Sequence, residues 1–289
     1  MKIQRKPEWL RKKINPGDQT EMRKLLAELR LNTVCQQAMC PNISECFASR
    51  QATFLILGNN CTRQCSFCNI EKKPPVPADP GEPDRVAEAV TRLALSHVVI
   101  TSPTRDDLSD GGSGLYAATV KAVHEAAPTC RIELLIPDFM GSRSALETVV
   151  TAHPDIIAHN LETVPRLYHI RSGADYFRSL ELLRLSNQLN PGIAGKSGIM
   201  LGMGEEVPEV IEVLKELRAT GCVYLSIGQY LAPSRNHYPV QEYVAPELFQ
   251  TLRETALELG FSHVESGPYV RSSYHADHYR CCDTSDKPL

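Results

Sequence analysis

Residues 61–70 read CTRQCSFCNI and come two residues after the apolar run ATFLILG at 52–58. The run has the length and composition of a buried strand. The loop carries three cysteines in the pattern CxxxCxxC, namely Cys61, Cys65 and Cys68. Three thiolates on one short loop can hold three irons of an iron–sulfur cube and leave the fourth iron without a protein ligand. Structural zinc is the competing interpretation, but it requires four closed ligands, usually from two short cysteine turns.

This loop, with the aromatic Phe67 directly before its last cysteine, resembles the signature of the radical S-adenosylmethionine (SAM) superfamily. The resemblance implies a 4Fe–4S cluster whose open iron chelates SAM. It also implies a 5'-deoxyadenosyl radical that abstracts hydrogen from an unactivated carbon. The loop alone does not identify the substrate.

Composition sets outer limits on the protein. The chain has 289 residues, 42% hydrophobic and 22% charged, which suits one large globular domain. A net charge of -3 gives no reason to expect a nucleic-acid partner. The basic start MKIQRKPEWLRKK lacks the apolar core of a signal peptide, and no run approaches a membrane span in length. We therefore expect a cytoplasmic protein without a membrane partner.

A second group of cysteines lies upstream, in VCQQAMCPNISECF at residues 34–47. Cys35, Cys40 and Cys46 are spaced too widely for a zinc turn and too regularly for scattered core thiols, so they predict a second cluster. Buried free cysteines remain the alternative. The two triads in this order are similar to those of the lipoyl synthase family. In that family the first triad binds an auxiliary 4Fe–4S cluster that is dismantled to supply sulfur.

The segment GPYVRSSYHAD at residues 267–277 extends the resemblance. From chemistry alone, two adjacent serines are a polar turn. The lipoyl synthase family carries RSSY at this place, and the resemblance implies that Ser273 ligates the fourth iron of the auxiliary cluster. Cys281 and Cys282 follow in a polar tail and are expected to be exposed thiols without a cluster role.

Six apolar runs alternate with amphipathic segments, which predicts an α/β fold with a parallel sheet. The runs lie at 52–58, 97–101, 131–137, 155–160, 196–202 and 223–228, and the expected helices include 85–95, 115–127, 144–152 and 208–220. A further helix is expected from Asp18, as its N-cap, to Leu31. Six strands favour a partial (β/α)6 TIM-like barrel over a closed eight-stranded one, and the resemblance implies the same radical SAM architecture.

We expect three regions along the chain. They are an N-terminal extension with the auxiliary cysteines (1–52), the radical SAM partial barrel (53–260) and a C-terminal extension with RSSY (261–289).

Residues expected to bind SAM follow the fourth and fifth apolar runs. Asn160 and Glu162 are two apart, so at an extended strand end they point to one side and can bind neighbouring hydroxyls. The resemblance implies that they hold the SAM ribose, with Arg171 pairing with its carboxylate. Glu162 is otherwise an acid at a helix N-terminus and Arg171 part of a surface ion pair. Met203 is expected to contact adenine, or else to pack in the core.

The resemblance implies a complete reaction. It is radical SAM-dependent insertion of two sulfur atoms at carbons 6 and 8 of a protein-bound octanoyl-lysine, which gives the lipoyl cofactor. The cofactors would be two 4Fe–4S clusters and SAM. The partners would be octanoylated lipoyl carrier domains (the 2-oxoacid dehydrogenase acyltransferase subunit and the glycine cleavage H protein), an electron donor such as flavodoxin or ferredoxin, and an iron–sulfur carrier protein that rebuilds the cluster.

Two other functions remain open at this point. One is another radical SAM sulfur-inserting enzyme, of the biotin synthase or methylthiotransferase type. The other is a non-catalytic iron–sulfur carrier or zinc-binding module.

Overall fold

The structure, a computed structural model, describes residues 5–12 and 19–279 of the chain. Asp18, Cys281 and Cys282, on which the sequence carries predictions, lie outside these ranges. The described residues form one eight-stranded sheet whose strands follow chain order from β1 to β8. The strands are β1 Asn32–Thr33, β2 Thr53–Leu55, β3 His97–Thr101, β4 Arg131–Leu135, β5 Ile156–Ala158, β6 Ala194–Leu201, β7 Cys222–Gln229 and β8 His263–Gly267. β1 pairs antiparallel with β2, and β2 to β8 run parallel.

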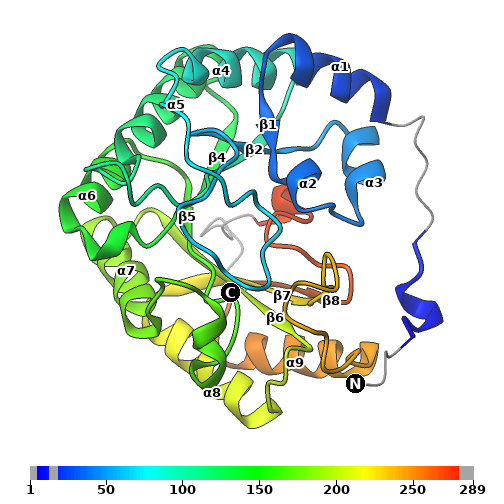
Figure 1. Cartoon of the computed structure of the whole chain (residues 1–289). Helices are drawn as coiled ribbons and strands as arrows, with labels where there is room; N and C mark the ends of the chain where they lie inside the picture. The colour runs from blue at the N-terminus through cyan, green and yellow to red at the C-terminus, as the bar shows by residue number, and fades with distance from the viewer. Residues whose placement is uncertain (1–4, 13–18, 280–289) are drawn as a thin grey trace, which may run out of the picture.

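The sheet curves around a centre, with the larger helices on its outside (Figure 1). The helices are α1 Thr20–Glu28, α2 Val34–Gln37, α3 Ile43–Ala48, α4 Glu82–Leu93, α5 Ser113–Ala126, α6 Arg143–Thr151, α7 Tyr176–Leu189, α8 Val207–Ala219 and α9 Pro246–Glu258. Short 3-10 helices lie at Glu8–Leu10, Phe139–Gly141, Pro165–Ile170 and Ala276–His278. No helix in the described ranges is long and apolar enough to cross a membrane.

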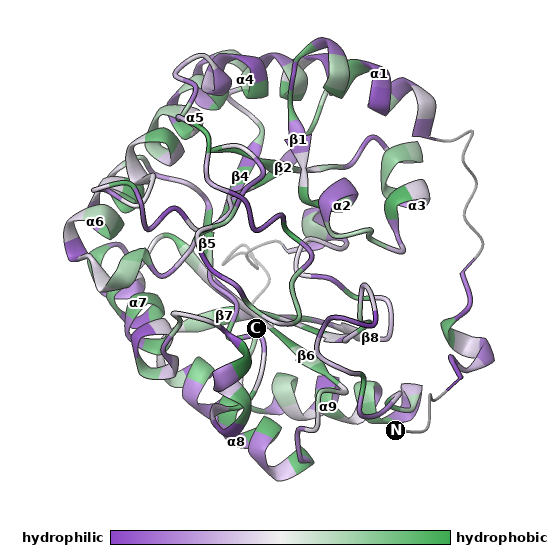
Figure 2. Cartoon of the chain, in the orientation of Figure 1, coloured by the Kyte–Doolittle hydropathy of each residue, from purple (hydrophilic) through white to green (hydrophobic). Residues whose placement is uncertain are grey.

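Helix α4 illustrates why these segments fold as they do. Pro83 stands in its first turn, where a missing N–H costs nothing, and Asp84 complements the positive end of the helix dipole. Val86 and Val90, four apart, are fully buried against the sheet. The helix ends at Leu93 and is capped by Ala94, whose backbone is left-handed with φ 52°. Figure 2 shows hydrophobic and hydrophilic residues alternating along helices of this kind.

The barrel is open, because within the described residues β8 does not pair with β1. The chain that follows β8 fills this side. Its Tyr279 is fully buried, with the ring 3.7 Å from Lys196 Nζ and the carbonyl 2.5 Å from Arg131 Nη1. Lys196 also forms an ion pair of 2.9 Å with Glu133, and both side chains are fully buried. The C-terminal segment is therefore anchored in the barrel interior by an aromatic ring over a buried ion pair.

The α/β partial barrel expected from the sequence is confirmed, and the six predicted runs are β2 to β7. The sequence missed β1, which has only two residues, and β8. The sequence of β8 is HVESG, in which only Val264 is buried, so it lacks the apolar run of the other parallel strands. Since β8 pairs with β7, the sheet continues past residue 260 into the expected C-terminal extension. The first long helix ends at Glu28 rather than Leu31, because β1 begins at Asn32.

Candidate functional site

A central cavity lies among the loops that follow the strands. It encloses about 1120 Å³, part of which is open to solvent. Its walls include Cys35 and Cys40 from the upstream triad, Cys68 and Phe67 from the CxxxCxxC loop, and Ser273 from the segment after β8. Three segments far apart in sequence therefore meet at one cavity, and both triads contribute to it.

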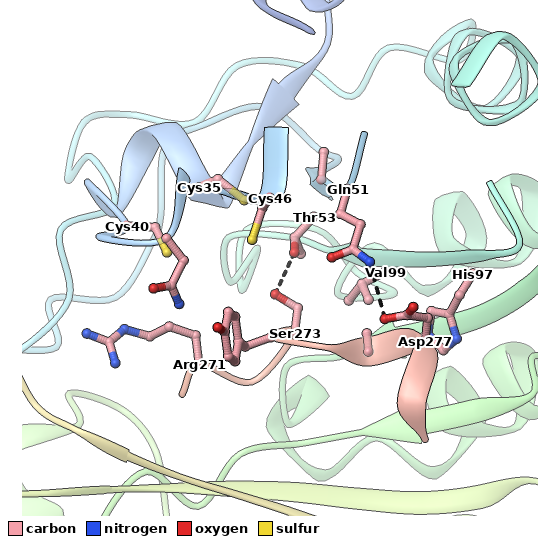
Figure 3. Close-up of a pocket in the computed structure, with 14 residues that line it drawn as sticks. Cys35, Cys40, Cys46, Gln51, Thr53, His97, Val99, Arg271, Ser273 and Asp277 are labelled. Carbon is pink, nitrogen blue, oxygen red and sulfur yellow. Dashed lines mark hydrogen bonds between the residues drawn. The ribbon is translucent and has the colours of Figure 1, made fainter. Parts of the chain in front are cut away.

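A second cavity of about 510 Å³ is lined by all three upstream cysteines (Figure 3). Cys35 belongs to α2, which is capped by the Thr33 hydroxyl, and Cys46 belongs to α3. Ser273 lines the same cavity and accepts a hydrogen bond of 2.6 Å from the Thr53 hydroxyl on β2. The structure thus brings the predicted fourth ligand to the three cysteines. Their residue types, three thiols and one hydroxyl, suit an iron–sulfur cluster with one oxygen ligand.

The spread of the sulfur atoms separates a cluster from a single zinc ion. Four ligands around one zinc at about 2.3 Å lie only about 3.8 Å apart. Among the described residues, neither cysteine triad forms a group with all three ligand atoms within 4.8 Å of one another. All six cysteines are free thiols. This arrangement suits ligands spread over several irons and disfavours the zinc interpretation.

Burial determines the charge of these thiols before any metal binds. It raises the pKa of Cys35 to about 11 and that of Cys46 to about 12. It also raises the pKa of Cys68 to about 12. These three thiols are therefore neutral on their own, and the positive charge of bound iron would convert them to thiolates.

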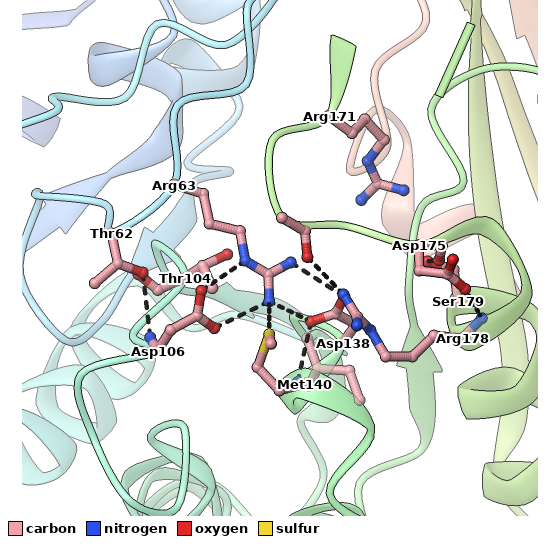
Figure 4. Close-up of polar contacts among 12 residues, drawn as sticks. Thr62, Arg63, Thr104, Asp106, Asp138, Met140, Arg171, Asp175, Arg178 and Ser179 are labelled. Atoms are coloured by element: carbon pink, nitrogen blue, oxygen red, sulfur yellow. Dashed lines mark hydrogen bonds and ion pairs between the residues drawn. The ribbon is translucent and has the colours of Figure 1, made fainter. Parts of the chain in front are cut away.

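Arg63, which belongs to the CxxxCxxC loop, anchors the loop to neighbouring segments (Figure 4). The Arg63 guanidinium, 7% exposed, donates to Asp106 at 2.8 Å and to Asp138 at 2.6 Å. Asp138 follows β4, is 1% exposed, and also accepts from Arg178 Nε at 2.9 Å. Burial alone would raise the pKa of Asp138, but the hydrogen bonds and charge of Arg63 hold it well below its usual range. The loop therefore has charged anchors after β3 and β4, which sequence reasoning missed.

Asn160 and Glu162 lie together on the wall of the central cavity, but not at the extended strand end that the sequence suggested. Glu162 is in the left-handed region with φ 67°, not in an extended strand end, and its Oε1 accepts a bond of 3.1 Å from Asn160 Nδ2. Burial raises the pKa of Glu162, which the charge of Arg171 partly offsets. A non-glycine residue in this region is strained, and such strain concentrates at functional sites.

Gly198 of β6 allows the side chains of Asn160 and Ser226 to pack directly against this strand. A Cβ atom at this position would lie 2.6 Å from Ser226 Oγ and 2.9 Å from Asn160 Oδ1. Ser272 Oγ donates to the same Asn160 oxygen at 3.1 Å. An amide, a carboxyl group and a hydroxyl thus lie together on the wall of the central cavity, and such a set can bind the vicinal hydroxyls of a ribose.

Arg171 and Met203 are placed differently from the other predicted residues. Arg171 lies behind Asn160 and donates to the backbone carbonyls of Asn160 (3.0 Å) and Leu161 (3.1 Å), not to a surface carboxylate. Its Nε has no hydrogen-bond partner. Met203 is fully buried in the hydrophobic core with Leu201 and Val210, and it is not among the residues that line the central cavity.

The sequence did not single out Arg271, which lines both cavities. Its Nη1 donates to the carbonyl of Val270 at 2.7 Å, and within the described residues it forms no ion pair. Burial lowers the pKa of Arg271. An unneutralised guanidinium between the two cavities favours anionic occupants.

Comparison with known proteins gives consistent results. A sequence model described as the radical SAM superfamily matches residues 55–217. The chain is 67% identical to a lipoyl synthase of Geotalea uraniireducens over 279 residues, covering 96% of this chain and 99% of the relative. It is 66% identical to a lipoyl synthase of Trichlorobacter lovleyi over 280 residues, covering 96% and 100%.

Solved structures agree at the level of the fold. Methylornithine synthase (PylB) matches with a TM-score of 0.55 at 16% identity, over 91% of this chain and 88% of that one. SuiB of Streptococcus suis bound to S-adenosylmethionine matches with a TM-score of 0.59 at 14% identity, over 91% and 65%.

Proposed function

The chain belongs to the radical SAM superfamily and, within it, to the lipoyl synthase family, and we propose that its central cavity is where the two cysteine triads act on one substrate. The activity of the chain is radical SAM-dependent sulfur insertion. In the form we propose, two sulfur atoms enter at carbons 6 and 8 of a protein-bound octanoyl-lysine. The observation that carries this proposal is that Cys35, Cys40, Cys68 and Ser273 line the same cavity.

The residues that would hold the cofactors follow from the donor sets. Cys61, Cys65 and Cys68 would hold the 4Fe–4S cluster that binds SAM, and the upstream triad with Ser273 would hold an auxiliary 4Fe–4S cluster. When bound, the first cluster with SAM supplies hydrogen abstraction from carbon and the auxiliary cluster supplies sulfur.

Asn160 and Glu162 would bind the ribose of SAM, and Gly198 lets the Asn160 side chain approach β6 closely. Arg171 acts behind them as a positioning residue, because its bonds to two carbonyls fix the backbone that carries Asn160. Phe67 forms part of the same wall. Arg271 contributes positive charge beside a cluster that three thiolates and an alkoxide would make anionic.

The remaining wall suits a fatty acyl chain. It contains apolar side chains from the N-terminal region, the strand ends and the segment after β8, namely Val34, Leu135, Ile199, Met200, Leu231 and Val270. Such a wall excludes water and binds methylene groups without choosing among them by hydrogen bonds. Selection of carbons 6 and 8 would then depend on how deep the tethered chain reaches.

The partners we propose are lipoyl carrier domains, of the 2-oxoacid dehydrogenase acyltransferase subunit and the glycine cleavage H protein, together with flavodoxin or ferredoxin as reductant and an iron–sulfur carrier. A cytoplasmic location is proposed because the six triad thiols must stay reduced to bind iron.

The test is mass spectrometry of an octanoyl-lysyl peptide incubated anaerobically with the reconstituted protein, SAM and a strong reductant. We expect two added sulfurs and about two 5'-deoxyadenosines per product, since two separate C–H bonds are broken. Deoxyadenosine without sulfur on the peptide would retain the radical SAM chemistry and contradict the proposed substrate. The absence of both products would contradict the radical SAM chemistry as well as the proposed substrate.

A further inference from the structure

One carboxylate and two imidazoles converge outside the two cavities. Glu265 lies in β8, His275 directly precedes the 3-10 helix Ala276–His278, and His278 ends it. One ligand atom from each lies within 4.8 Å of the other two. In the part of the chain that the structure describes, this is the one such group of three histidine, cysteine or acidic residues.

The distances are longer than hydrogen bonds. His278 Nδ1 is 3.7 Å from Glu265 Oε1, and His275 Nδ1 is 3.9 Å from Glu265 Oε2. Hydrogen bonds between nitrogen and oxygen span about 2.7–3.2 Å. Two ligands of one zinc ion, each about 2.0–2.1 Å from the metal, lie about 3.3–3.4 Å apart in a tetrahedral site. The two carboxylate–imidazole distances would therefore contract by a few tenths of an ångström around a shared metal ion.

The backbone directs both rings to the same side. His275 is left-handed, with φ 51° and ψ 40°, and its ring stacks on Tyr274 at 3.8 Å. His275 and His278 are three residues apart across a 3-10 turn, a spacing that superimposes side chains, and their ring centroids are 4.7 Å apart. A strained backbone at His275 that aligns two imidazoles with a carboxylate is a feature that simple surface charge does not require.

A cluster of ion pairs is the plainer interpretation. Glu265 already has one such partner, because His263 Nε2 lies 2.9 Å from Glu265 Oε1. A single carboxylate does not need two further imidazoles held beyond hydrogen-bonding range. The side chains of Glu265, His275 and His278 are 19%, 36% and 54% exposed, so an ion can reach them from solvent.

We propose that Glu265, His275 and His278 form a binding site for a first-row divalent metal ion of the Zn²⁺ or Fe²⁺ kind, distinct from both cysteine triads. Two imidazoles and one carboxylate favour these borderline ions over Mg²⁺ and Ca²⁺, which prefer oxygen ligands. Water completes the coordination. The bound ion ties the segment after β8 back to β8, two residues beyond Ser273. An effect of this ion on the auxiliary cluster would depend on the proposed role of Ser273, whereas binding of the ion would not.

The test uses the protein with both clusters loaded, so that the triad cysteines are not free to take up added metal. Zn²⁺ is titrated by calorimetry, and Co²⁺ by its visible absorption. We expect one ion per chain beyond the cluster iron, and at least tenfold weaker binding in Glu265→Gln and in His278→Gln, since each loses a ligand. His237→Gln is the matched control, because this loop histidine bonds to Ser234 and lies outside the group.

Iron and sulfide contents equal to the parent's show that a variant is folded. Hydrogen exchange of residues 271–279 gives a second readout on the unmutated protein, and we expect Zn²⁺ to slow it. Parent-like affinity in both ligand variants, or the absence of a stoichiometric site in the parent, would overturn the proposal. Neither readout depends on sulfur insertion, so failure here is distinguishable from failure of the proposed function.

Discussion

Arg63 and Asp138 are joined by two hydrogen bonds, 2.6 Å from Nη2 and 3.1 Å from Nη1, across 75 residues of sequence. Arg63 lies between the first two cysteines of the CxxxCxxC loop, and Asp138 follows β4. The position of these cysteines is thus set by the sheet and not by the loop alone.

Replacing Arg63 by Met is expected to loosen this loop. Asp106 and Asp138 lose a buried partner, which costs about 3 kcal/mol of unfolding free energy. The first cluster should be lost more readily, while the auxiliary cluster, held by α2 and α3, is retained. Iron and sulfide per chain before and after gel filtration measure this. Arg184→Met, which removes only an exposed pair with Glu181, is the control, and equal iron loss in both variants would contradict the prediction.

The two triads should separate the two halves of the reaction. Cys61→Ala, Cys65→Ala or Cys68→Ala is expected to abolish 5'-deoxyadenosine formation. Cys35→Ala, Cys40→Ala or Cys46→Ala is expected to preserve SAM cleavage and prevent sulfur transfer. Deoxyadenosine and thiolated peptide are quantified in the same reaction. Normal sulfur insertion by the second set would show that the auxiliary cluster is not the donor.

Ser272 and Ser273 are adjacent yet face different partners, so they form a natural pair of variants. Ser273 lines the second cavity, that of the upstream cysteines, and is hydrogen-bonded to Thr53, whereas Ser272 is hydrogen-bonded to Asn160. Ser273→Ala should lower sulfur insertion and leave SAM binding near the parent value. Ser272→Ala should instead weaken SAM binding a few-fold, by the roughly 1 kcal/mol of one neutral hydrogen bond. Calorimetry with SAM and product analysis distinguish them, and identical phenotypes would contradict the assignment.

Gly198→Ala tests whether the position of the Asn160 side chain matters for SAM binding. Its Cβ would come within 2.9 Å of Asn160 Oδ1, so Asn160 must move. We expect SAM affinity to fall at least tenfold, which corresponds to about 1.4 kcal/mol, and stability to fall by about 1–3 kcal/mol from overpacking. Gly267→Ala is the control, because its Cβ meets only a Val270 methyl group at 3.7 Å. Unchanged SAM affinity in Gly198→Ala would place the ribose elsewhere.

His159 should make the stability of the protein depend on pH. Burial, aided by the charge of Arg171, lowers its pKa to about 4 from 6.5, and its Nδ1 donates to the carbonyl of Ile136 at 2.8 Å. Below pH 6.5 the unfolded chain binds a proton that the folded chain refuses, so this stability is present above 6.5 and lost as the pH falls toward 4.

The expected loss attributable to His159 is roughly 3 kcal/mol over that range. Urea unfolding at about pH 7 and about pH 5 measures it. His159→Gln should show a smaller pH dependence than the parent. The partly exposed His124→Gln serves as the control, and equal dependence in His159→Gln and the parent would contradict the prediction.

The local pattern of apolar residues predicted those strands and helices whose formation depends mainly on burying one apolar face. The apolar runs of β2 to β7 and the amphipathic helices between them were found by periodicity, since each buries a continuous apolar face. β8 was missed because its contribution is main-chain pairing with β7, which a polar sequence does not reveal.

The sequence predicted which residues form the site better than it predicted how these residues are held in place. The cysteine triads and Ser273 were recognised by motif, and the structure brings the upstream triad and Ser273 to one cavity. The anchoring of Arg63 depends on contacts 43 and 75 residues away, which no local pattern carries. Asn160 and Glu162 meet through a left-handed backbone at Glu162, a conformation that depends on its pairing with β6.

The hydrogen bond between Thr53 and Ser273 joins residues 220 positions apart, and both residues line the second cavity, that of the upstream cysteines. A ribosome adding about 5–20 residues per second needs roughly 10–45 seconds to make that stretch. For nearly all of this interval, from the synthesis of Cys68 onward, both cysteine triads are complete while Ser273 has not yet been made. With the ligand set proposed here, the auxiliary cluster can be completed only late in biosynthesis, and the thiols of the nascent chain must stay reduced until then.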